Sequence, residues 1–219
     1  LSTGDIGEFT TTQISNLTTT QIRGLSTTKI GALAETQVAA LTTTQLSSLG
    51  TASLSALDAT QVGQLTTTQI RSLTATQVTG LNATDIAELT ADQLDALTNT
   101  QAQALTATNM ASLVDTQIQA LTTSAIRSLS TTNVAAMSTT QIAALTTQQA
   151  SALQVTQLNA LTSTKFGALV ETQIGALTTT QVTGLSTTNL TSLDATQLQA
   201  FVTTQVNALS ASQVGALTT

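Results

Sequence analysis

Residues Leu65–Ser72 read LTTTQIRS, and variants of this octad recur along the whole chain. Counted from Leu1, 27 octads and three further residues account for all 219 residues without an insertion or a deletion. With the positions labelled a to h, a is nearly always Leu, d is mostly Thr, e mostly Gln, f apolar and h small. A strict short period is typical of stacked repeats. We therefore expect one repeat array over residues 1–219, an excerpt of a longer repetitive protein.

Composition excludes several classes of function. Only 7% of residues are charged, against roughly a quarter in typical soluble domains. The net charge of −6 argues against a nucleic-acid partner. The chain has no Cys, which excludes disulfides and thiolate metal sites, and no apolar run long enough to span a membrane. The five basic residues are scattered: Arg23, Lys29, Arg71, Arg127 and Lys165.

Positions b and e carry the signals of a helix N-terminus. Position b is usually Thr or Ser, and otherwise a residue such as Asp58 or Asn82, whose oxygen can accept a bond from a free backbone N–H. The Gln three residues later completes a capping box by reaching back to the N–H of residue b. Acidic residues at c, such as Glu35 and Asp115, suit the positive end of a helix dipole. The pattern predicts a short helix from c to about h in each octad.

The apolar spacing predicts a bend in every octad. The residue at f and the next Leu at a are three apart, which places both on one face of a helical turn. An unbroken helix rotates roughly 100° per residue, so an eight-residue period would carry the Leu side chains around the whole cylinder. Successive Leu side chains share one core only if the chain bends near the junction of a and b.

These features predict an all-α fold, a tight rod-like solenoid with one very short helix per octad. Positions f and a would form a continuous core, the small residue at h would let neighbours approach, and two or three octads would complete a superhelical turn. A β-solenoid is the alternative, because Thr, Ile and Val favour strands. The lack of Pro and of a corner position reserved for Gly, Asn or Asp argues against it.

No residue is expected to be catalytic or to bind a cofactor or metal. The chain has no His, and its hydroxyl groups have no base beside them. Lys29 and Lys165 replace Gln at e, and we interpret both as surface substitutions. Four carboxylates within residues 81–96 could surround a hard cation, but we interpret them as a solvated acidic surface. They are Asp85, Glu88, Asp92 and Asp95.

The unit LTTTQIxAL resembles the octapeptide arrays of very large bacterial surface or secreted proteins of adhesion or haem-utilisation type. The resemblance covers the whole chain, through Leu at a, Thr at d, Gln at e and Ile or Val at f. It implies an extracellular or cell-surface location. Haem binding does not carry over, because the chain lacks His and has almost no aromatic residues.

Two functional hypotheses follow. The first is an extracellular structural rod, stalk or filament subunit that self-associates end-to-end or laterally. The second is a binding surface, in which the periodic Thr array recognises ice or a polysaccharide, so that a surface or glycan partner is left open. An enzyme is not expected.

Overall fold

The computed structural model describes residues 2–217 and contains 27 short α-helices, one per octad, with no strand within that range. The all-α prediction is therefore confirmed, and the β-solenoid is wrong for the residues described. The chain divides into two compact units, Leu1–Ser112 and Leu113–Thr219. The octad period continues unbroken through both units.

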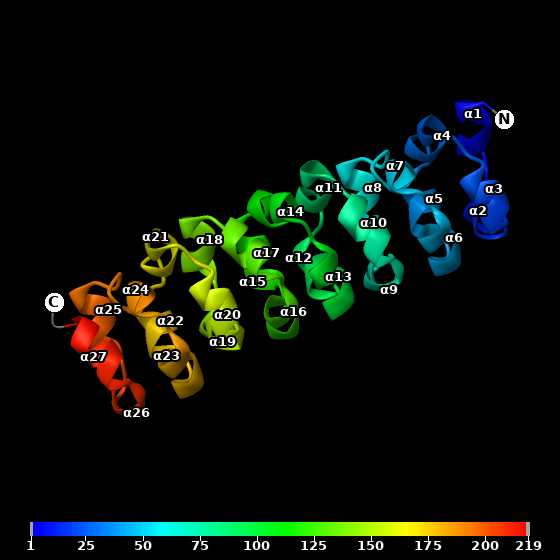
Figure 1. Ribbon diagram of the computed structural model, residues 1–219. Coiled ribbons are helices and arrows are strands. Elements are labelled where there is room, and N and C mark those ends of the chain that lie inside the picture. Colours follow the sequence, from blue (N-terminus) through cyan, green and yellow to red (C-terminus); the bar gives the residue numbers. More distant parts are fainter. Residues whose placement is uncertain (1, 218–219) are drawn as a thin grey trace. The chain divides into compact units, whose positions relative to one another are not determined.

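The helices of the two units are shown in Figure 1. Those of the first are α1 (Thr3–Gly7), α2 (Thr11–Ser15), α3 (Thr19–Arg23), α4 (Thr27–Gly31), α5 (Glu35–Ala39), α6 (Thr43–Ser48), α7 (Thr51–Leu54), α8 (Ala59–Gly63), α9 (Thr67–Ser72), α10 (Ala75–Gly80), α11 (Ala83–Ala87), α12 (Ala91–Asp95), α13 (Asn99–Ala104) and α14 (Ala107–Ser112). Those of the second are α15 (Asp115–Ala120), α16 (Thr123–Ser128), α17 (Thr131–Ala136), α18 (Thr139–Ala144), α19 (Thr147–Ala152), α20 (Val155–Asn159), α21 (Ser163–Phe166), α22 (Glu171–Ala176), α23 (Thr179–Gly184), α24 (Thr187–Leu190), α25 (Ala195–Gln199), α26 (Thr203–Ala208) and α27 (Ala211–Leu217).

Each octad starts its helix at c and turns the chain at a and b. Helix α9 shows the geometry: its N-cap Thr66 has φ −69° and ψ 157°, and its C-cap Leu73 has φ −60° and ψ 135°. Both residues are extended, so the bend lies at the predicted junction. No residue in the described range has a positive φ. The bend therefore requires no glycine, which explains why no position of the octad is reserved for one.

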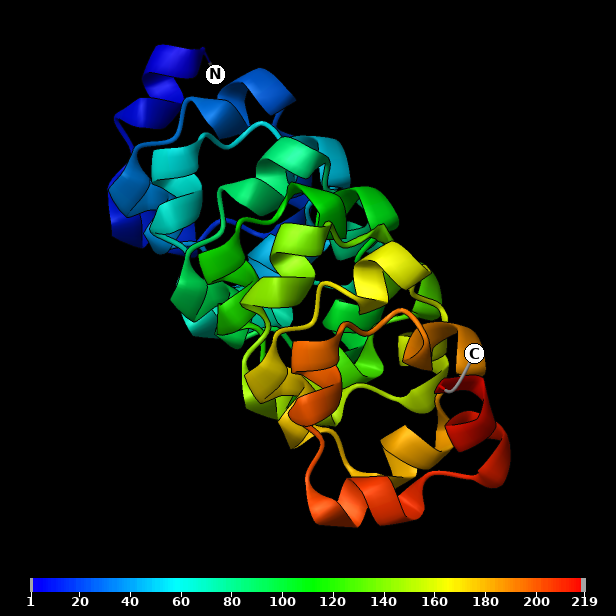
Figure 2. The ribbon, with the colours of Figure 1, turned by 90° about the vertical axis from the view of Figure 1, so that its left-hand side faces the viewer.

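Within each unit the helices coil into successive turns, so that each helix packs against the third helix along the chain. Figure 2 shows the coiling of the ribbon. Pairs such as α10 and α13 in the first unit and α16 and α19 in the second are in contact. Side chains that bond across turns reach backbone atoms 25 to 31 residues away. One turn therefore takes between three and four octads. The expectation of two or three was too low, because the sequence fixes the spacing of the core residues but not the radius at which they meet.

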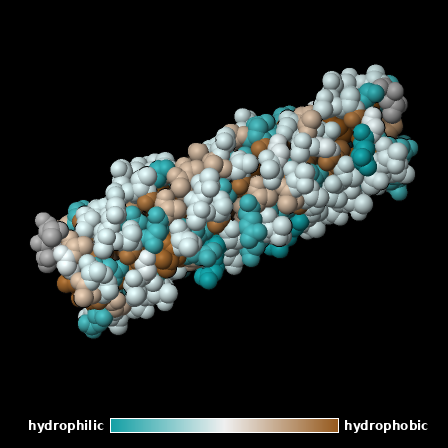
Figure 3. Space-filling model, viewed as in Figure 1, coloured by the Kyte–Doolittle hydropathy of each residue, from teal (hydrophilic) through white to brown (hydrophobic). Residues whose placement is uncertain are grey.

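The core is a thread of aliphatic side chains from f and a. Ile70 at f is fully buried and Leu73 at the next a is 6% exposed. The hydroxyl residues at b, c and d lie mostly on the outside, so the face of the molecule in Figure 3 is largely of intermediate hydropathy with scattered hydrophilic and hydrophobic groups. Positions f and a therefore form the core as predicted.

Small residues at g and h allow adjacent turns to approach. A Cβ on Gly80 at h would lie 2.3 Å from Cγ2 of Thr51, three octads earlier. A Cβ on Gly31 at g would lie 2.6 Å from the carbonyl oxygen of Ala56, three octads later. The predicted role of h is confirmed at Gly80, and position g has the same constraint where it meets the end of a helix in the next turn.

Candidate functional site

The Gln at e caps its own helix. In the octad LTTTQIRS the Thr66 N–H donates to Oε1 of Gln69 at 2.7 Å, and the Gln69 N–H donates to Oγ1 of Thr66 at 3.2 Å. This is the predicted capping box. Where b is Val, as at Val114, the hydroxyl is missing, but the backbone N–H still donates to Oε1 of Gln117. The Gln half of the box is thus independent of the residue at b.

The same Gln side chain also fastens its octad to the preceding turn. The two N–H groups of Nε2 of Gln69 lie within hydrogen-bond distance of three carbonyl oxygens, those of Leu41 at 2.8 Å, Ala39 at 3.2 Å and Val38 at 3.3 Å, so that one N–H is shared. The carbonyls of Val38 and Ala39 are at the C-terminal end of α5, where helices lack N–H partners, and that of Leu41 lies two residues beyond it. The Val38 carbonyl also accepts from the N–H of Leu41 at 3.1 Å. One amide therefore caps the start of its own helix and the end of a helix one turn earlier.

This arrangement recurs in both units, and we call the set the glutamine ladder. Each member is at most 4% exposed except Gln197, which is 6% exposed. Each donates from Nε2 to the carbonyl at a, 28 residues before it, and most also donate to the carbonyl at f or g. The members are Gln37, Gln45, Gln61, Gln69, Gln77, Gln93, Gln101, Gln141, Gln149, Gln157, Gln173, Gln181, Gln197, Gln205 and Gln213.

Two glutamines at the start of the first unit lack this second role. Gln13 and Gln21 are exposed, and Oε1 of each accepts from its N-cap N–H. Their Nε2 atoms donate to no atom of residues 2–217. Both lie in the first turn of the unit, which has no earlier turn to bind. They show what the octad does when only its local capping bonds are made.

Asp85 departs from the ladder and corrects the interpretation of the acidic stretch as a solvated surface. It replaces Gln at e, is only 7% exposed, and cannot donate. Its Oδ2 accepts instead from Oγ of Ser55 at 2.5 Å and from the N–H of Asn82 at 2.8 Å. Burial of Asp85 is not predictable from the octad, because its three acidic neighbours have the same local pattern of charge and lie at positions that are exposed or half-buried.

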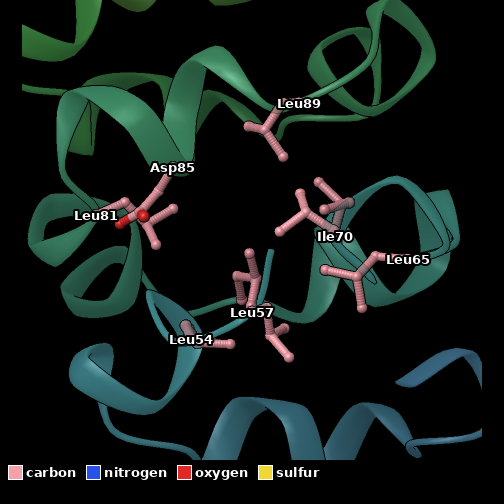
Figure 4. Close-up of a pocket in the computed structure, with 9 residues that line it drawn as sticks. Leu54, Leu57, Leu65, Ile70, Leu81, Asp85 and Leu89 are labelled. Carbon is pink, nitrogen blue, oxygen red and sulfur yellow. The ribbon is translucent and has the colours of Figure 1, made fainter. Parts of the chain in front are cut away.

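Beside Asp85 lies a small cavity of about 20 Å³ (Figure 4). Leucine and isoleucine side chains form most of its wall, among them Leu57, Ile70 and Leu89. Burial, then the negative charges of Asp85 and Asp58, raise the pKa of Glu88 above its ordinary value. The cavity is large enough for about one water molecule. Apart from Asp85, its lining residues are all aliphatic.

Lys165 also differs from its interpretation as a surface substitution. It is half-buried at e, and its Nζ donates to the carbonyl oxygen of Ala135 in the preceding turn. A lysine thus supplies the donor that Gln supplies elsewhere. Lys29 is half-buried too, in α4, which packs against α1.

Part of the Thr array is engaged within the chain. The hydroxyls at b cap the helices, as at Thr66, and Thr51 at c lies against Gly80 of the next turn. Recognition of ice or a polysaccharide by the remaining Thr side chains stays a prediction.

The described residues offer no assembled metal or membrane site. No group of three or more acidic, His or Cys residues among them is placed to hold a metal ion. None of the helices from α1 to α27 has the length and apolar character needed to cross a bilayer. The expectation of no catalytic or cofactor-binding residue stays a prediction.

Comparison with known families supports a repeat region. The ALTTAQ repeat family matches residues 1–35 and 110–147. Its description corresponds to positions h to e of the octad, which this chain writes as ALTTTQ at residues 40–45. No curated protein matches the chain significantly. The chain is thus similar to the ALTTAQ repeat over about a third of its length, and the adhesion-type context stays a prediction.

Proposed function

We propose that the chain is a structural element, an extracellular rod, stalk or filament subunit without enzymatic activity. The observation that carries this proposal is the glutamine ladder. Its amides are buried, and both ends of each amide are used to join an octad to itself and to the preceding turn. The buried polar side chains of the ladder are therefore engaged in holding the coil together. The extracellular location rests on the resemblance to surface repeat arrays.

Self-association is part of the proposal, because the described octads leave two complementary faces uncovered. In the first turn Gln13 and Gln21 present amide donors beside the half-buried Leu17. In the last turns Val206 and Val214 at f are 50% and 47% exposed, whereas f is buried in most other octads. The carbonyls of these last octads correspond to those that the ladder binds elsewhere. Where no further octad covers these faces, a second copy stacked head-to-tail would repeat the internal contact.

Sedimentation velocity over a range of concentrations, with negative-stain electron microscopy, tests this proposal. We expect linear assemblies that lengthen with concentration. Val206→Lys, which places a charge on the uncovered face, should keep the chain monomeric. Val114→Lys is the matched control, because Val114 is 58% exposed on a helix start and not at f, and it should assemble normally. Single particles at every concentration would overturn the filament subunit and leave the stalk.

A further inference from the structure

The octads that lack Gln at e are not distributed at random. Eight of the nine are separated by 24, 24, 32, 24, 24, 32 and 24 residues. The same spacing therefore repeats after 80 residues, or ten octads. We call these eight octads the seam, and their e residues are Asp5, Lys29, Ser53, Asp85, Asn109, Asn133, Lys165 and Asn189. Ala125 is the one exception.

In the first unit the seam octads stack on one another. Helix α1 packs against α4, α4 against α7, and α11 against α14. The step from α7 to α11, which spans four octads, is made by the hydrogen bond between Ser55 and Asp85. Three steps from Asp5 to Asp85 therefore correspond to three turns of the coil, and the seam lies along one side of this unit.

The second unit has the same arrangement. The four-octad step from α17 to α21 is made by Nζ of Lys165 and the carbonyl of Ala135. Helix α21 then packs against α24, which carries Asn189. Both spacings join octads in successive turns, as the bonds from Gln69 to Ala39, four octads earlier, and to Leu41, three octads earlier, also show.

Turn-to-turn hydrogen bonding is weaker along the seam than elsewhere. In the ladder, Gln101 donates to two carbonyl oxygens of the preceding turn at 2.6 and 2.8 Å, and Gln69 shares its two amide hydrogens among three. In the seam, the two bonds from Asn109 are longer, at 3.0 and 3.4 Å, Asn189 donates one at 2.9 Å, and the Ser53 side chain makes none with the described residues. Asp85 is joined to the earlier turn only by the hydroxyl of Ser55.

Aligned weak links act together in a way that scattered ones do not. In a coil of equivalent octads, a weak link at random positions is bridged by strong links directly above and below it. When the weak links of successive turns lie on the same side of the coil, the turns can separate on that side with the loss of few hydrogen bonds. We propose that the seam is a built-in line of compliance, along which the coil opens when it bends while the octads stay folded.

Half of the seam residues are buried, namely Asp85, Asn109, Asn133 and Asn189. A molecule bound to the outer surface would not contact these four side chains, so their pattern concerns the coil itself. Their shared effect is on the attachment between turns. This inference does not depend on an extracellular location or on filament formation.

Hydrogen exchange followed by mass spectrometry on the full chain tests the seam. We expect the octad Leu49–Ala56 to exchange about fivefold faster than the ladder octads on either side, the factor that corresponds to about one lost hydrogen bond. Asn109→Gln should slow exchange in Leu49–Ala56, two seam steps away and unaltered in sequence, by about threefold or more. The control variant Gln101→Asn weakens the attachment between turns at an octad outside the seam. It should leave the exchange rate of Leu49–Ala56 unchanged.

A composition-matched variant separates alignment from amino-acid content. The double variant Q101N/N109Q has the wild-type composition but moves one weak link off the seam, and it should behave as N109Q does. If N109Q does not fold, Lys165→Gln with exchange read at residues 185–192 makes the same test in the second unit. The proposal would be overturned if the exchange rate of the unaltered seam octads changed in none of these variants. It would also be overturned if that rate changed equally in Q101N.

Discussion

Replacing Gln69 by Glu separates the two roles of the ladder within one side chain. The substituted carboxylate can still accept from the Thr66 N–H, so the local capping box survives. It can no longer donate, and it places a negative charge against the carbonyl oxygens of Val38, Ala39 and Leu41. A glutamate is as good at a capping position as glutamine, so any loss of stability reports the contact between turns.

The expected loss is large for a change of one atom. About 1 kcal/mol is lost for each hydrogen bond, and a buried unpaired charge adds more. We estimate a loss of about 3–5 kcal/mol, which should lower the melting temperature of the unit by on the order of 10 °C. Gln21→Glu is the matched control: it changes the same position of the octad LTTTQIR, but Gln21 is exposed and binds no other turn. That variant should melt within about 2 °C of the wild type.

The pH dependence provides an independent check. The new carboxyl at position 69 favours its protonated form in the folded chain, because that form can donate to a carbonyl, so its folded pKa lies above the unfolded value of about 4.3. Stability is therefore retained below that unfolded value and lost as pH rises through the folded pKa. Melts by circular dichroism at pH 4 and pH 7 measure both effects. Equal melting of the two Glu variants at pH 7 would refute the ladder as the attachment between turns.

Three further predictions concern packing and charge. Gly80→Ala should lower the free energy of unfolding by about 1–3 kcal/mol, because the added Cβ would meet Thr51. Gly63→Ala has open space around the added Cβ and should raise the free energy of unfolding by up to about 1 kcal/mol through helix propensity. Urea unfolding measures both. Phe166→Ala removes a fully buried side chain and should cost about 3–5 kcal/mol in the same assay. Because burial and neighbouring carboxylates raise the pKa of Glu88 above 4.5, its contribution to stability is present below that value and lost as pH rises through the folded pKa; Glu88→Gln should flatten this dependence in melts from pH 4 to 7.

Local structure was predictable because the residues that determine it lie within one octad. The cap at b, the Gln at e and the apolar pair at f and a each act within about eight residues, and α9 shows all of them. The second role of Gln was not predicted, because a capping box needs only its oxygen. One signal was present: Glu serves a capping box equally well, yet it occupies e in none of the 27 octads. The exclusion of Glu indicates that the amide N–H₂ has a partner of its own.

The number of octads per turn could also have been approached from the sequence. Capping and core positions are the same in every octad, so they contain no information about which octads become neighbours. Substitutions at e do contain it, since Asp85 faces Ser55 and Lys165 faces Ala135, each four octads earlier, while other seam steps span three. The 80-residue period of substitutions at e therefore indicates which octads are neighbours in successive turns. In an array of nearly identical units, the departures from the consensus locate the tertiary neighbours, and the consensus itself describes only the local fold.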